Sequence, residues 1–105
     1  MDYSYFKIRG LYQYFILESF EERIISFCQS STKPTIMIDM KRVELIDSSG
    51  LMVLLKALRL VESMDRRLVL AQLHPSVQII FEITGLDEIF NIVETANQVP
   101  LAIAA

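Results

Sequence analysis

The hydrophobic residues of this chain follow two different spacings, and the change between them marks where a strand gives way to a helix. Residues 35–40 are almost all apolar, which is typical of a central strand covered on both faces. From residue 51 onward, apolar residues recur three and four positions apart, the spacing that puts side chains on one face of a helix. We therefore predict a buried strand that leads directly into an amphipathic helix.

The same alternation occurs before and after this unit. Further strands are predicted at 3–9, 68–73 and 88–93, and further helices at 14–29 and 75–84. Pro75 suits the first turn of a helix because its missing N–H costs nothing there, and Gly85 is well placed to end that helix. The tail stays open, since Thr95 can start a last helix but Pro100 would remove one of its internal hydrogen bonds.

Alternating strands and helices predict an α/β fold, with a mostly parallel sheet of four to five strands and helices packed on it. The length of 105 residues suits a single domain spanning 1–105, because single domains usually contain about 50 to 200 residues. The hydrophobic fraction of 52% is high for a small domain, where roughly 45–50% is usual, and suggests apolar surface kept for a partner.

Charge and composition narrow the classes of function. A net charge of −3 without any long basic run argues against nucleic-acid binding. Cys28 is the only cysteine, which excludes an internal disulfide and a cysteine-based zinc cluster, and we expect no metal or other cofactor. The start of the chain does not have the pattern of a secretory signal, and the longest aliphatic run extends only from Leu51 to Leu55. We therefore expect a cytoplasmic protein without membrane insertion.

The joint between the central strand and its helix is Asp47-Ser48-Ser49-Gly50, called here the DSSG segment. One interpretation is a helix cap, whose side-chain oxygens accept from backbone N–H groups and contribute about 1 kcal/mol. A cap alone explains the segment poorly, because Leu51 stands where a capping box carries Glu or Gln. Gly50 in a first turn costs up to about 1 kcal/mol relative to Ala, which suggests close approach of a backbone or a bulky group. The second interpretation is therefore a binding site.

The predicted helix offers a docking surface next to these serines. A polar row bordered by apolar residues runs down from the hydroxyl groups, which is a pattern found at interfaces, although an ordinary solvated face fits it as well. The predicted partner-binding residues are Asp47, Ser49, Gly50, Met52, Val53, Lys56 and Arg59.

Ser48 is the residue at which this surface could be switched. A phosphate would add about −1.5 to −2 charges, which the positive end of a helix dipole tolerates. Beside Asp47, and against a partner packed over Gly50, the same charge would repel and would be costly to desolvate. Modification would then abolish binding and leave the fold intact.

Two groups of residues resemble the STAS domain, the module shared by bacterial anti-sigma-factor antagonists and the cytosolic tails of sulphate transporters. The strand-loop-helix signature of the antagonist branch is similar to Ile38-Asp39-Met40, Val43 and Ile46-Asp47-Ser48-Ser49-Gly50-Leu51. The later Ser/Thr-Gly-Leu element is similar to Thr84-Gly85-Leu86 with Ile89-Phe90. Together with Gly10 at a compatible spacing, the resemblance covers almost the whole chain.

The resemblance implies a phosphoswitch in transcriptional, stress or nutrient signalling. In that family the first serine of DSSG, here Ser48, is phosphorylated by an anti-sigma factor that is also a serine kinase of the histidine-kinase-type ATPase fold. A PP2C-type phosphatase restores it. The unphosphorylated domain binds the kinase, so it is substrate and ligand rather than catalyst.

This chain departs from the family pattern in two places. Relatives commonly carry an additional strand before the position of Phe6, and this chain starts too late for a full one. After Gly10 the family often has an acidic turn that contributes to the partner surface, whereas this chain reads Leu11-Tyr12-Gln13-Tyr14. These departures leave open whether the partner is a standard anti-sigma factor.

Two other classes of function compete with the phosphoswitch. An enzyme with a serine nucleophile lacks the G-x-S-x-G elbow, and the single histidine, His74, precedes Pro75 and suits a capping or surface role. Cys28 lies among apolar helix positions and is predicted to be core rather than a reactive thiol. The alternative that stays open is an unphosphorylated accessory subunit or scaffold of a larger complex, such as a lipid-transport ABC ATPase.

Overall fold

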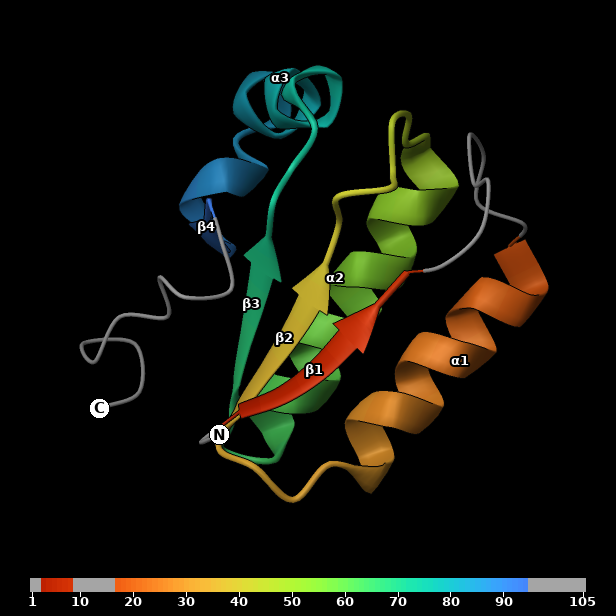
Figure 1. Ribbon diagram of the computed structural model, residues 1–105, viewed down its shortest axis with the longest axis vertical. Helices are drawn as coiled ribbons and strands as arrows, with labels where there is room; N and C mark the ends of the chain where they lie inside the picture. The colour runs from red at the N-terminus through yellow and green to blue at the C-terminus, as the bar shows by residue number, and fades with distance from the viewer. Residues whose placement is uncertain (1–2, 9–16, 95–105) are drawn as a thin grey trace.

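The computed structural model describes residues 3–8 and 17–94. Within them, strands alternate with helices along the chain (Figure 1). The elements are β1 (Tyr3–Lys7), α1 (Leu17–Ser30), β2 (Thr35–Asp39), α2 (Ser48–Ser63), β3 (Arg67–Ala71), α3 (Pro75–Thr84), the 3₁₀ turn η1 (Leu86–Glu88) and β4 (Asn91–Val93). The predicted alternation of strands and helices is confirmed.

The strands form one sheet in the order β1-β2-β3-β4, and every neighbouring pair is parallel. In the middle of the sheet Ile38 lies between Phe6 of β1 and Leu70 of β3. Because the strands are parallel, their carboxyl ends meet at one edge, and the loops that follow β2 and β3 leave from that edge (Figure 1). The predicted parallel sheet is confirmed, with four strands in the described residues.

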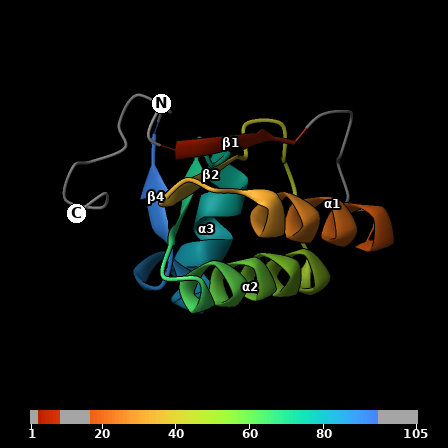
Figure 2. The ribbon, with the colours of Figure 1, turned by 90° about the horizontal axis from the view of Figure 1, so that it is seen from below.

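The main hydrophobic core lies between one face of the sheet and the helices, which Figure 2 shows together on one side. It combines strand residues such as Ile38 and Leu70 with Ile24 of α1, Leu54 of α2 and Phe81 of α3, all of them fully buried. Each such side chain contributes about 1.5–3 kcal/mol through burial. The opposite face carries a smaller buried cluster of Met37, Val69, Ala71 and Val93. All five residues of β2 are buried, as the continuous apolar run predicts.

The third helix has the predicted ends. Pro75 is its first residue, and His74 is the N-cap, whose side chain accepts from the backbone N–H of Ser76. Gly85 ends the helix with a φ of 76°, a left-handed conformation in which a side chain would be strained. His74 therefore has the capping role predicted for it.

Three strand predictions need correction. The strand predicted at 68–73 ends at Ala71, because Gln72 takes a φ of 60° that no strand accommodates. The strand predicted at 88–93 is only Asn91–Val93, since the chain after Gly85 first forms η1. The strand predicted at 3–9 ends at Lys7, with Ile8 already outside it. The positions of residues 9 and 10, the start of the first helix at residue 14 and the tail after Glu94 lie outside the described residues.

Candidate functional site

The DSSG segment is held in place by the loop that follows β2. Val43 and Ile46 are buried in the core, while the residues between them are exposed. At the start of the loop, Met40 donates its backbone N–H to the carbonyl of Ala71 at 2.8 Å, and Val43 donates to the carbonyl of Met40 at 3.0 Å. The loop is therefore anchored at both ends and presents the segment at the carboxyl edge of the sheet (Figure 1).

A second contact fixes this loop from the side of α3. The Ser76 hydroxyl donates a hydrogen bond to the backbone carbonyl of Glu44, and the same hydroxyl lies 2.9 Å from Nδ1 of His74. The first turn of α3 is thus tied to the loop that carries the phosphoacceptor candidate. Residues 44 and 76 are far apart in the sequence, so no local pattern could indicate this contact.

Asp47 is the N-cap of α2. Its Oδ1 accepts the backbone N–H of Gly50 at 2.9 Å, and its backbone carbonyl accepts the N–H of Leu51 at 3.0 Å. The cap interpretation of the segment is confirmed for Asp47. Since the carboxylate supplies the cap, neither serine hydroxyl is needed to begin the helix.

Ser48 is the first residue of α2, and it is exposed. Within the described residues its side chain takes part in no hydrogen bond. The backbone N–H groups of a first helical turn have no partner inside the helix, and the helix dipole gives this end a partial positive charge. A hydroxyl at this place is accessible to an enzyme, and a phosphate there would meet a favourable backbone field.

The exposed row of α2 agrees only in part with the predicted docking surface. Met52, Lys56 and Arg59 are exposed, and Ser49 is half-buried. Lys56 is also engaged within the molecule, because its Nζ lies 2.7 Å from Oε1 of Glu21 on α1. This ion pair joins the two helices that lie side by side below the sheet (Figure 2).

Gly50 and Val53 are wrongly placed by the sequence interpretation, because both are buried. The buried stripe of α2 begins at Gly50 and continues through Val53, Leu54, Ala57, Leu58 and Val61. Gly50 therefore packs inward at the top of this stripe, and Val53 belongs to the core with an exposure of 2%. Leu51, where the helical spacing of apolar residues begins in the sequence, is half-buried and packs against the core.

Leu45 is a surface residue that the sequence analysis did not single out. It is exposed, and only Ile46 separates it from the DSSG segment. Met52, one helical turn after Ser48, is also exposed, so large apolar side chains stand on both sides of the serine in the sequence. The signal that could have found it is its place in the loop between the core residues Val43 and Ile46, where both intervening residues are exposed.

Within residues 3–8 and 17–94, no group of three or more His, Cys, Asp or Glu side chains is placed to hold a metal ion. Cys28 is fully buried, as predicted, and this burial raises the pKa of its thiol to about 11. Such a thiol is protonated at neutral pH and is a poor nucleophile.

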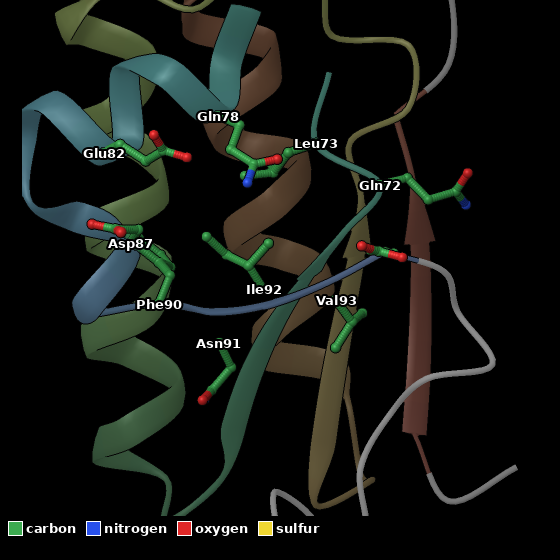
Figure 3. Close-up of a pocket in the computed structure, with 10 residues that line it drawn as sticks. Gln72, Leu73, Gln78, Glu82, Asp87, Phe90, Asn91, Ile92 and Val93 are labelled. Carbon is green, nitrogen blue, oxygen red and sulfur yellow. The ribbon is translucent and has the colours of Figure 1, made fainter. Parts of the chain in front are cut away.

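A cavity of about 540 Å³ opens at the other end of the sheet's carboxyl edge, beside β4 (Figure 3). Its walls combine polar side chains, including Gln78 and Glu82 of α3 and Asp87 of η1, with the apolar side chains of Phe90 and Ile92. No residue of the DSSG segment lines it. The cavity is therefore separate from the Ser48 site.

None of the helices in the described part of the chain has the length and apolar character needed to cross a membrane.

The architecture is that of a parallel α/β domain with an exposed serine at the start of its second helix. The family model of the STAS domain matches residues 4–99. The chain belongs to the STAS domain family, which the resemblance of the DSSG segment and its neighbours implies.

Solved structures of this fold come from several bacterial proteins. An anti-sigma-factor antagonist (STAS) domain protein from Planctomyces limnophilus matches with a TM-score of 0.83 and 19% identity, over 96% of this chain and 90% of that one. A sulfate transporter family protein from Wolinella succinogenes matches with a TM-score of 0.79 and 14% identity, over 99% of this chain and 86% of that one. A candidate anti-sigma factor antagonist from Thermotoga maritima matches with a TM-score of 0.74 and 19% identity, over 99% of this chain and 83% of that one. At these identities the likeness concerns the fold.

Proposed function

We propose that this domain is a phosphoswitch of the anti-sigma-factor-antagonist type, with Ser48 as the phosphoacceptor. The observation that carries the proposal is that one residue caps α2 while the next residue stays exposed. Asp47 supplies the cap, and Ser48 stands exposed beside it without an internal hydrogen bond in the described residues. A phosphate can therefore be added without removing a contact that the fold uses.

The unphosphorylated domain binds a partner at the exposed surface around Ser48. This surface combines Asp47 and Ser49 with the exposed side chains of Met52 and Arg59, and Leu45 extends it with an apolar contact. A doubly charged phosphate in the middle of such a contact must be desolvated, and it lies next to the carboxylate of Asp47. The complex is expected to dissociate on phosphorylation.

The partner that fits this scheme is an anti-sigma factor with serine kinase activity and a histidine-kinase-type ATPase fold, opposed by a PP2C-type phosphatase. Family membership and the antagonist-like structural neighbours support this choice. The domain then acts as ligand and substrate, in the cytoplasm, and carries out no reaction itself. Its output is the release of a regulator, such as a sigma factor, that the kinase holds.

Two measurements test the proposal. Intact-mass analysis of the protein purified from its own cells should find a population with one phosphate, which tandem mass spectrometry should place on Ser48. Ser48→Asp should then lose the kinase in a pull-down, whereas Ser48→Ala should retain it under all conditions. Ser26→Asp is the matched control, because Ser26 is an exposed serine on α1 and not on α2. If Ser48→Asp held the kinase as well as the wild type, the switch would be refuted.

The accessory-subunit alternative is favoured by one finding, the shared fold of a sulfate transporter family protein. A domain that serves as a permanent subunit of a transporter or a lipid-transport ABC ATPase needs no modification at Ser48. It would show no phosphate in cells, and Ser48→Asp would stay in its complex. The same two measurements therefore separate the two functions.

A further inference from the structure

The outward face of α3 is apolar, which is unusual for a surface helix. On a helical wheel, Val77 and Phe81 face the core, and Ile79 and Ile83 point in the opposite direction. Ile79 is 55% exposed and Ile83 is 79% exposed. Ile89, just after η1, is 56% exposed. Single exposed apolar residues are normal, but an aliphatic row on the face turned away from the core marks an interaction surface.

Acidic and amide side chains border this aliphatic row. Gln78 and Glu82 form the next row of α3, between the isoleucines and the core, and they line the cavity beside β4. Asp87 of η1 lines the same cavity, and Figure 3 shows it below Glu82. The aliphatic row and the carboxylate-lined cavity are therefore parts of one surface, called here the α3–η1 surface.

The cavity side of this surface carries negative charge. Glu82 and Asp87 line the cavity, and no Lys or Arg is among its lining residues. An isologous contact between two copies would bring these carboxylates together, and an anionic lipid surface would repel them. The field favours a partner of positive charge, which it would also steer during encounter.

We propose that the α3–η1 surface is a second docking site, which takes a basic amphipathic helix of a partner protein. Aliphatic side chains of that helix pack on Ile79 and Ile83, and Lys or Arg side chains on its flank approach Glu82 and Asp87 at the cavity. This is the helix-on-surface mode of recognition, with apolar anchors for affinity and charge for orientation. The site is distinct from Ser48, so the domain can hold one partner while it exchanges another.

The test uses two synthetic helical peptides that share a leucine face and differ in flanking Lys or Glu residues. Each is titrated into the ¹⁵N-labelled full chain. The Lys peptide should shift the amide signals of Ile79, Ile83 and Asp87, and the shifts should weaken as salt is added. The Glu peptide should leave them unchanged. Equal binding of both peptides, no binding of the Lys peptide, or shifts centred elsewhere would overturn the proposal.

Matched variants locate the contact. Ile83→Gln should weaken binding of the Lys peptide about tenfold, since it removes one apolar anchor. Ser26→Gln, which changes an exposed residue on α1 outside both proposed surfaces, should bind like the wild type. Sedimentation of the free domain should show a monomer; a dimer that Ile83→Gln dissociates would assign the surface to a second copy and refute the basic partner.

Discussion

The Tyr5 hydroxyl donates a hydrogen bond to Oδ2 of Asp39, which joins β1 to β2 near the carboxyl edge of the sheet. The other carboxylate oxygen, Oδ1, accepts the backbone N–H of Lys41 at 2.9 Å. Asp39 is almost fully buried, so both contacts compensate for the loss of water around its charge. The carboxylate thus fixes the first turn of the loop that leads to Ser48.

The Tyr5 contact predicts a pH dependence of stability. Burial, followed by the hydrogen bond to Asp39 and the negative charge of that residue, raises the pKa of Tyr5 from 10.0 to about 12. Because the folded pKa lies above the unfolded one, the contribution of Tyr5 is complete below pH 10 and is lost as the pH rises toward 12. Tyr5→Phe should cost about 1 kcal/mol at neutral pH.

Urea unfolding of the wild type and of Tyr5→Phe, followed between neutral pH and about pH 11, checks this prediction. The phenylalanine variant cannot ionise at this position, so the difference in unfolding free energy between the two proteins should shrink above pH 10. A constant difference across the whole range would show that the Tyr5 hydroxyl does not contribute in this way.

Removing the cap of α2 should destabilise the domain. Asp47→Ala leaves the N–H of Gly50 without its partner and should cost about 1 kcal/mol in unfolding free energy, measured with urea. Glu62→Ala, a change of an exposed carboxylate near the other end of the same helix, should lie within about 0.5 kcal/mol of the wild type. Equal effects of the two changes would contradict the capping role.

A negative charge at Ser48 should leave the fold intact. Ser48→Asp places a carboxylate at the start of α2, where the helix dipole contributes roughly 0.3–1 kcal/mol and the neighbouring Asp47 opposes it. We expect the unfolding free energy to stay within about 0.5 kcal/mol of the wild type. A loss of several kcal/mol would mean that any loss of binding by this variant reflects unfolding and not a switch.

The strands, the helices and their order could be predicted because their signals are local. The apolar run of β2, Pro75 at the start of α3 and Gly85 at its end each act within one or two turns of chain. The position of Ser48 at the beginning of α2 follows from the same reasoning, because Asp47 is a good N-cap residue. These features need no knowledge of what packs against them.

Other features depend on distant parts of the chain and were missed or misplaced. The burial of Gly50 and Val53 depends on how α2 packs in the core, which the spacing of apolar residues from position 51 onward did not show. The contact between Ser76 and Glu44 joins two loops that the topology brings to one edge. The cavity beside β4 is lined in part by Asp87 of η1, a turn that the predicted strand at 88–93 did not indicate.

The contrast between buried Val53 and exposed Met52 on α2 gives the last prediction. Val53→Ala removes two buried methyl groups from the core and should cost about 2 kcal/mol in unfolding free energy. Met52→Ala changes the adjacent residue, which is 51% exposed, and should cost less than about 0.5 kcal/mol. In a partner pull-down, Met52→Ala should weaken binding more than Val53→Ala does, because Met52 lies on the proposed docking surface and Val53 does not. If Met52→Ala were the more destabilising change, the buried stripe assigned to α2 would be wrong.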